Sequence, residues 1–441
     1  MALPNRPSQP TGHWLRSNRS DHRARSHAEA HGEGEREAAE VPEHVMIPAG
    51  KAELVTTDGA LAELLAHLRA AGSFAYDSEF IGELTYVPKL CLIQVATTER
   101  VALIDPLADL DLTPFWELIA DGSVEKIVHA GLQDIEPVVR ILNKPAARIF
   151  DTQIAAGLAG MTYPLSLSKL VYELVGYKLG KGLTFSHWDQ RPLSASQLRY
   201  GADDVRFLPA AREELKRRLE RLKHAKYADE ESCNLCDPNL QRFDPESQYL
   251  KIRGANGLPA TNLAALRELV RWRDTVAREN DAPPRGFLKD EVLLDLARTP
   301  IRSVEKLGKV RGLPRPVEER YGRELVEAVE RGLKTAKEDL PEVKVTEETP
   351  REKFRTDSLW AAVQTICIGK QVDPMLLTSR QEVSDLMRVI SHGGNVESFR
   401  LMKGWRRVIV GEPILQLLAG TLQCRISWKE DGLAIEECGE G

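Results

Sequence analysis

The chain has 441 residues, of which 42% are hydrophobic and 29% are charged, and its formal net charge is -6. This length allows two or three domains, and the negative charge excludes a uniformly basic nucleic-acid-binding protein, so nucleic-acid binding would depend on local patches. The six cysteines form no disulfide framework, no signal-peptide pattern is present, and no apolar run approaches the roughly 20 residues of a membrane helix, so we expect a cytoplasmic protein without membrane segments.

The first half of the chain predicts a disordered tail followed by an α/β domain. Residues 1–45 lack apolar periodicity and form the predicted tail. An amphipathic helix is predicted at 59–71, and an acid-bearing strand follows it at 74–80. Further strands are predicted at 91–96, 101–105 and 127–130, and a hairpin at 97–100 joins the first two. Helices are predicted at about 115–120, 132–143, 151–159, 165–174 and 204–223. The last of these helices is expected to kink at Pro209. Strands early and helices later indicate a mixed sheet flanked by helices.

The second half predicts two helical domains separated by an acidic linker. We expect a connector at 226–260, a helical domain at 261–338, a linker at 339–354 and a second helical domain at 355–436. A weak repeat at an offset of 90 residues, seen for example in Pro284 and Pro374, indicates two copies of one domain, although shared amphipathic periodicity produces similar matches. Cys233 and Cys236 form an isolated C-x-x-C, which without a second pair is more typical of chance than of a metal site.

Acidic residues at three places could share a metal ion. On a strand, Asp77 and Glu79 point to the same face, where they repel each other unless a cation lies between them; a solvated acidic strand end is the alternative. Asp134 follows the fourth strand at the start of a predicted helix. Tyr200 precedes two acids, Asp203 and Asp204, and the spacing does not decide between them.

The motifs around these acids closely resemble those of bacterial ribonuclease D, in the tyrosine-containing branch of the DEDD exonuclease superfamily. They are Asp77-Ser78-Glu79-Phe80, Leu92-Ile93-Gln94, Leu103-Ile104-Asp105-Pro106, His129-Ala130-Gly131-Leu132-Gln133-Asp134, Asp151-Thr152-Gln153, Trp188 to Pro192-Leu193, and Tyr200-Gly201-Ala202-Asp203-Asp204-Val205. The resemblance covers about 50–215, and residues 262–333 resemble an HRDC domain. It implies an RNase H-like mixed-sheet exonuclease domain at 46–225, followed by two all-α HRDC-type domains. The sequence differs from the usual family motifs at Ser78, where many members have threonine, and at Lys181–His187.

The resemblance also implies a chemistry. Two divalent ions, Mg²⁺ or Mn²⁺, would be held by Asp77, Glu79, Asp134 and Asp204, with Asp77 bridging both ions. Tyr200 would orient the attacking water. Ser78 and Phe80 would contact the terminal nucleotide, and His129 and Gln133 would support the site beside Asp134.

The implied activity is 3′→5′ exoribonuclease action. It would release nucleoside 5′-monophosphates from structured RNA such as tRNA precursors, and we expect a monomer. A DNA-directed exonuclease and a catalytically silent nucleic-acid-binding module are the alternatives.

Overall fold

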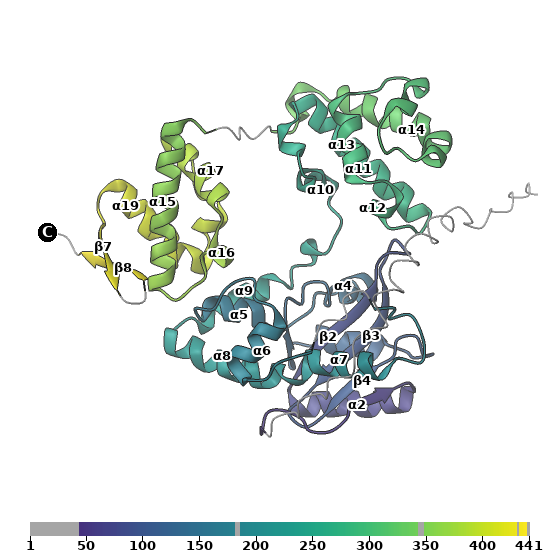
Figure 1. Ribbon diagram of the computed structural model, residues 1–441, viewed down its shortest axis with the longest axis vertical. Helices are drawn as coiled ribbons and strands as arrows, with labels where there is room; N and C mark the ends of the chain where they lie inside the picture. Colours follow the sequence, from purple (N-terminus) through teal and green to yellow (C-terminus); the bar gives the residue numbers. More distant parts are fainter. Residues whose placement is uncertain (1–43, 181–185, 343–347, 430–431, 439–441) are drawn as a thin grey trace, which may run out of the picture. The chain divides into compact units, whose positions relative to one another are not determined.

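The computed structural model describes residues 44–180, 186–342, 348–429 and 432–438 (Figure 1). The predicted tail lies almost entirely outside these ranges, and so do residues 181–185 of the segment before Trp188. In the part of the chain that the structure describes, no helix combines the length and the apolar character needed to cross a membrane.

The first region is built on a six-stranded mixed sheet, which confirms the predicted fold class. In chain order the strands are β1 (Glu53–Val55), β2 (Ser73–Ile81), β3 (Lys89–Ala96), β4 (Val101–Ile104), β5 (Glu125–Val128) and β6 (Ile149–Asp151). Their order in the sheet is β1-β4-β3-β2-β5-β6. Strand β3 runs antiparallel to both of its neighbours, and the other pairs are parallel. Strands β1 and β6 were not predicted, because three residues are too few to establish a period of two.

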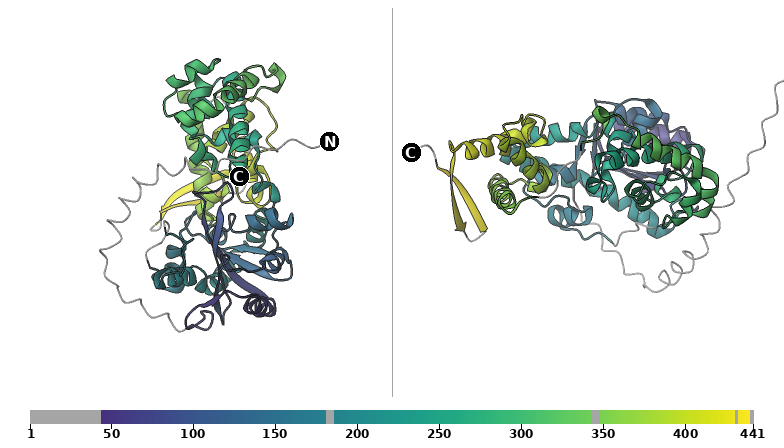
Figure 2. Two further views of the ribbon diagram at one scale, coloured as in Figure 1. Left: turned by 90° about the vertical axis from the view of Figure 1, so that its right-hand side faces the viewer. Right: turned by 90° about the horizontal axis from the view of Figure 1, so that it is seen from above.

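Helices cover both faces of this sheet, as the left view of Figure 2 shows. Phe74 and Tyr76 of β2 pack in one apolar cluster with α2 (Asp58–Ala71), α3 (Thr113–Ala120) and α4 (Glu136–Leu142). Ala75, between them, points to the opposite face and joins the cluster of α5 (Thr152–Leu158), α6 (Leu167–Val175), α7 (Ala195–Arg206) and α8 (Leu208–Leu222). The alternation along β2 therefore fixes which residues face which layer.

Two predicted boundaries in this region differ from those in the structure. The helix predicted at 204–223 is two helices, α7 and α8, that meet at Phe207. Pro209 lies in the first turn of α8, where its missing N–H costs nothing, whereas within a continuous helix its ring would clash with the preceding turn. The connector predicted from residue 226 begins inside a helix, α9 (Ala225–Asn234), whose Ala228 and Ser232 are buried.

The rest of the described chain is mainly helical. Its helices are α10 (Pro245–Gln248), α11 (Ala260–Glu279), α12 (Pro284–Phe287), α13 (Asp290–Arg298), α14 (Arg315–Leu333), α15 (Pro350–Gly369), α16 (Pro374–Leu377), α17 (Arg380–Ser391), α18 (Gly404–Arg406) and α19 (Glu412–Ala419). Helices α15 and α16 have the lengths of α11 and α12 and begin 90 residues after them, the offset of the sequence repeat. A hairpin that was not predicted, β7 (Gln423–Lys429) and β8 (Gly432–Cys438), follows α19.

Candidate active site

Strand β2 carries Asp77 and Glu79 on one face. Alternation places them on the same side as Ala75, which packs with the helices of the α5–α8 layer. In the antiparallel register Asp77 lies opposite Gln94 and Glu79 opposite Leu92, and opposed residues point to the same face. The two acids therefore face the side of the sheet that α7 covers.

Helix α7 lies close to this face because it has a glycine at the point of contact. A Cβ atom on Gly201 would lie 3.0 Å from Leu92 Cδ2 and 3.4 Å from Gln94 Cγ. The start of the helix is fixed by a capping box, in which Ser194 accepts a hydrogen bond from the Gln197 N–H and the Gln197 side chain accepts one from the Ser194 N–H. The close contact and the fixed start bring the residues around Gly201 toward β2.

The structure separates the two neighbouring acids of α7. Asp204 is only 9% exposed, and its carboxylate receives a hydrogen bond from the Tyr200 hydroxyl and interacts with Glu79. Asp203 instead lies 3.6 Å from Arg206, measured from Oδ1 to Nε. Spacing alone left this choice open, whereas the structure places Asp204 among the other acids and gives Asp203 a basic partner.

Asp134 lies in the loop between β5 and α4 and is held by residues of β2. The Tyr76 hydroxyl donates to the backbone carbonyl oxygen of Asp134 at 2.6 Å. The Ser78 hydroxyl donates a short hydrogen bond to Asp134 Oδ1. Residues 131–135 form turns, and α4 begins at Glu136, later than predicted. Asp134 therefore belongs to an irregular loop whose position depends on side chains of the neighbouring strand.

Burial, together with neighbouring acids, raises the pKa values of all four acids. Desolvation and then the charges of Asp134, Asp204 and Glu79 hold the pKa of Asp77 well above its usual range. Burial and Asp134 raise the pKa of Glu79 to about 7. Burial raises the pKa of Asp134 to about 6 although the Ser78 hydrogen bond opposes it, and burial, Glu79 and Asp203 raise that of Asp204 to about 8. None of the main causes of these four shifts is a basic side chain of the described residues.

The chemistry of this acidic cluster fits a hard divalent cation. Its donors are carboxylate oxygens, which Mg²⁺ and Mn²⁺ prefer. A bound cation would favour the ionised carboxylates and so oppose the burial and repulsion that raise their pKa values. Gln94, opposite Asp77, is fully buried and neither its Nε2 nor its Oε1 atom has a hydrogen-bond partner in the described structure. As the side chains stand, no three His, Cys, Asp or Glu residues in the described ranges are arranged to hold an ion, and Ser78 occupies one oxygen of Asp134.

The other predicted site residues have different surroundings. The two ring nitrogens of His129 are bonded, Nδ1 to Thr152 Oγ1 and Nε2 to the Leu165 carbonyl oxygen, both at 2.9 Å. Burial lowers the pKa of His129, and its two hydrogen bonds anchor the start of the Asp134 loop. Gln133 is exposed and Phe80 is half-buried. Their predicted contacts with substrate remain predictions.

Sequence reasoning gave no role to three residues that contact the site. Tyr76 was predicted only as part of a strand, Gln94 and Asp151 only as parts of family motifs. Gln94 carried a usable signal, since it is a polar residue within the apolar run of β3. Asp151 accepts hydrogen bonds from backbone N–H groups of the Asp134 loop, a contact between distant segments that has no local sequence signature.

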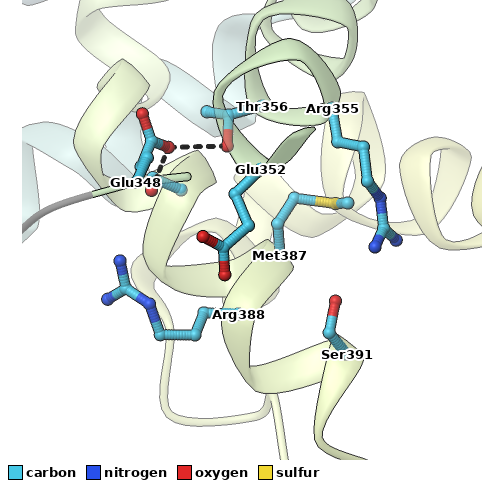
Figure 3. Close-up of a pocket in the computed structure, with 8 residues that line it drawn as sticks. Glu348, Glu352, Arg355, Thr356, Met387, Arg388 and Ser391 are labelled. Carbon is cyan, nitrogen blue, oxygen red and sulfur yellow. Dashed lines mark hydrogen bonds between the residues drawn. The ribbon is translucent and has the colours of Figure 1, made fainter. Parts of the chain in front are cut away.

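A pocket in the helical region at 348–391 contains none of these residues. Figure 3 shows Glu348 accepting a hydrogen bond from the Thr356 hydroxyl, with Glu352, Arg355 and Arg388 around the same hollow. Hydrogen bonds from Ser384, Arg380 and Thr356 lower the pKa of Glu348 to about 2. The acid therefore remains ionised within its own hydrogen-bond network and is separate from the candidate active site.

Comparisons with known proteins identify the family. Residues 52–220 match the family model of a 3′-5′ exonuclease, and residues 262–329 match that of the HRDC domain. The ribonuclease D of Gluconacetobacter diazotrophicus is 32% identical over 376 residues, which cover 84% of this chain and 93% of that protein. This chain belongs to the ribonuclease D family.

Further similarities agree with membership of the ribonuclease D family. The ribonuclease D of Granulibacter bethesdensis is 34% identical over 389 residues, covering 86% of this chain and 95% of that protein. The crystal structure of Escherichia coli RNase D, described as an exoribonuclease involved in structured RNA processing, matches with a TM-score of 0.72 and 28% identity, covering 84% of this chain and 99% of that one. Exonucleases of the DEDD superfamily, to which ribonuclease D belongs, generally depend on divalent metal ions.

Proposed function

We propose that this ribonuclease D family member is a 3′→5′ exoribonuclease that trims the 3′ ends of structured RNA precursors, such as those of tRNA, and releases nucleoside 5′-monophosphates. The observation that carries the proposal is the cluster of four largely buried carboxylates without a basic partner among the described residues. Asp77, Glu79, Asp134 and Asp204 would hold two divalent ions, Mg²⁺ or Mn²⁺. When bound, these ions would activate water and stabilise the leaving oxygen.

Tyr200 acts in this proposal as a hydrogen-bond donor. Burial and then Asp204, Glu79 and Asp77 raise the pKa of its hydroxyl above the usual value, so the hydroxyl stays protonated at neutral pH. A protonated phenol orients an attacking water but does not remove its proton. The ring lies 6.0 Å from that of Trp188 between centroids, which restricts its movement.

The residues beside the metal ligands have supporting roles. Ser78 is bonded to Asp134, so its hydroxyl positions that carboxylate and reaches the terminal ribose only if this bond is exchanged. Phe80, two residues along β2 from Ser78, would contact the terminal base. His129 and Gln133 flank the loop of Asp134, and His129 holds its start.

RNA is the proposed macromolecular partner, and the HRDC-type helical regions would add phosphate contacts. We propose that the protein acts as a monomer in the cytoplasm. Cys91, Cys233, Cys236 and Cys367 are free thiols among the described residues, which agrees with a reducing compartment.

The proposal is tested with 5′-labelled RNA that has a single-stranded 3′ tail. We expect a ladder of products shortened from the 3′ end in Mg²⁺ or Mn²⁺, and none in EDTA. A DNA strand of equal length, present as competitor, should be cut more slowly; faster cutting of DNA would support a DNA-directed exonuclease instead. RNA that is bound but remains intact in both metals would support a catalytically silent binding module.

A further inference from the structure

We propose that Asp151 is a positioning residue that holds the Asp134 loop in place for metal binding. The inference rests on the proposed function, because it assigns a task to a residue outside the four acids of that site. It concerns the motif Asp151-Thr152-Gln153, whose first residue ends β6 and precedes α5.

The Asp151 carboxylate is shared between two segments of the chain. It is 2% exposed. Its Oδ1 atom accepts hydrogen bonds from the Gln153 and Ile154 N–H groups of α5 at 2.8 and 3.2 Å, and from the Ala130 N–H at 3.3 Å. Its Oδ2 atom accepts from the Gly131 N–H at 3.0 Å. One carboxylate therefore joins the start of α5 to the turn that leads into the Asp134 loop.

The turn that Asp151 holds has an unusual backbone. Ala130 has φ = 58°, in the left-handed region that residues with a Cβ atom rarely adopt. At the next residue a Cβ atom would lie 2.5 Å from Val128 Cβ, so only glycine fits there. Such a turn persists when the surrounding structure fixes it, and the two N–H groups that Asp151 binds belong to Ala130 and Gly131.

The loop is thus fixed at both ends. Asp151 holds it at Ala130 and Gly131, and the Tyr76 hydroxyl holds the carbonyl oxygen of Asp134. Because Asp134 is three residues from Gly131, release of the turn would move its carboxylate relative to Asp77. Residues that orient metal ligands typically change metal affinity when they are mutated.

The alternative is that Asp151 acts only as the N-cap of α5. The two roles can be tested separately, because Oδ1 binds the N–H groups of α5 and Oδ2 binds only the Gly131 N–H. Asn caps helices as well as Asp does. In Asp151→Asn the amide oxygen would remain near the three donors around Oδ1, and the NH₂ group would then face the Gly131 N–H. The variant keeps the helix cap and loses the contact with Gly131.

The test measures Mn²⁺ binding to the full-length protein from the electron paramagnetic resonance signal of free Mn²⁺, together with RNA cleavage over a range of Mn²⁺ concentrations. For Asp151→Asn we expect a Mn²⁺ affinity about 10- to 100-fold lower than that of the wild type. The KM for RNA should stay within about twofold, and excess Mn²⁺ should restore most of kcat, because the four carboxylates are still present.

Asp373→Asn is the matched control, since Asp373 caps α16 through Met375 N–H at 2.8 Å and contacts none of the four acids in the described structure. It should bind Mn²⁺ as the wild type does. Asp151→Ser is the second variant if Asp151→Asn fails to fold. Serine retains one capping oxygen and has no second one, so this variant should show the same loss of Mn²⁺ affinity.

A folded Asp151→Asn or Asp151→Ser protein with the Mn²⁺ affinity and metal dependence of the wild type would overturn the proposal and leave Asp151 as a helix cap. A wild-type protein that neither binds Mn²⁺ nor cleaves RNA would contradict the proposed function itself, and the role of Asp151 would fall with it. The two failures are distinguished by whether the wild type is active.

Discussion

In the exonuclease region, the buried carboxylate of Asp105 and the cluster of four buried or half-buried carboxylates at the candidate active site have opposite electrostatics. Asp105, at the end of β4, is paired with Arg191: Nε donates to Oδ2 at 2.6 Å and Nη2 to Oδ1 at 2.5 Å. The four acids at the candidate active site have no such partner among the described residues. Burial alone would raise the pKa of Asp105, but the hydrogen bonds from Arg191 and the Leu107 N–H outweigh it, so that this pKa lies below its usual range.

A buried acid with a basic partner and buried acids without one have different roles in the protein. A buried acid with a bidentate arginine is neutralised within the protein and stabilises one arrangement of the chain. The pKa values of Glu79 and Asp204, raised to about 7 and about 8, indicate acids that the protein leaves without compensation. Such a site costs stability until a cation binds.

The largest effect is expected for Asp77→Asn. The change removes a charged ligand from the centre of the cluster, and because the cations contribute several kcal/mol, RNA cleavage should fall by about a thousandfold or more. In EDTA the same variant should have a higher Tm than the wild type at pH 8, because it lacks a carboxyl group whose ionisation burial and the neighbouring acids oppose. Activity assays and thermal unfolding of the same preparations measure both effects.

Asp77→Asn with wild-type cleavage would remove Asp77 from the ligand set. A lower Tm in EDTA would mean instead that Asp77 is stabilised by the protein, as Asp105 is. The two readouts therefore test the comparison independently of each other.

A smaller effect, with the opposite sign on stability, is expected for Asp105→Asn. Arg191 would lose its charged partner while its Nη2 still donates to the Cys91 carbonyl oxygen at 2.7 Å. We expect a loss of about 2–3 kcal/mol of unfolding free energy, with cleavage per folded molecule within about threefold of the wild type. Urea unfolding and cleavage at low temperature measure the two quantities, and a thousandfold loss of cleavage without loss of stability would contradict the prediction.

Asp105 and the four acids should also differ in how their contributions to stability depend on pH. In EDTA, Asp134, Glu79 and Asp204 have folded-state pKa values of about 6, 7 and 8, above the values near 4 of unfolded chains. The folded state therefore binds more protons between about pH 4 and 8, and the stability contributed by these acids falls as the pH rises through this window.

For Asp105 the sign is reversed, because its folded-state pKa is lowered: its contribution is present above about pH 4 and is lost at lower pH. Thermal unfolding between pH 5 and 8 in EDTA, with and without excess Mg²⁺, checks the prediction for the four acids. The decrease of Tm with rising pH should be smaller in Mg²⁺ than in EDTA, and smaller in Asp77→Asn than in the wild type. An equal slope in wild type and variant would exclude the cluster as its source.

The sequence predicted the mixed sheet and, through strand periodicity and the family resemblance, named four candidate acids, but it did not predict what holds those acids in place. Asp77 and Glu79 follow from the period of a strand, and their faces could be predicted. The choice of Asp204 over Asp203 depends on how α7 lies against β3, which spacing does not encode. Tyr76 and Asp151 act through contacts with the Asp134 loop across 58 and about 20 residues of sequence, and no local pattern reports such contacts.

The smallest effect is expected at Gly201, where α7 contacts β3. In Gly201→Ala the new Cβ atom would lie 3.0 Å from Leu92 Cδ2, so α7 would shift by a few tenths of an ångström and carry Asp204 and Tyr200 away from β2. We expect cleavage to fall about three- to tenfold, whereas stability should change little, because the helix propensity of alanine offsets the tighter contact. Gly59→Ala in α2, where a Cβ atom meets nothing within 4 Å, is the matched control. Unchanged cleavage in Gly201→Ala would show that the distance between α7 and β2 does not limit the reaction.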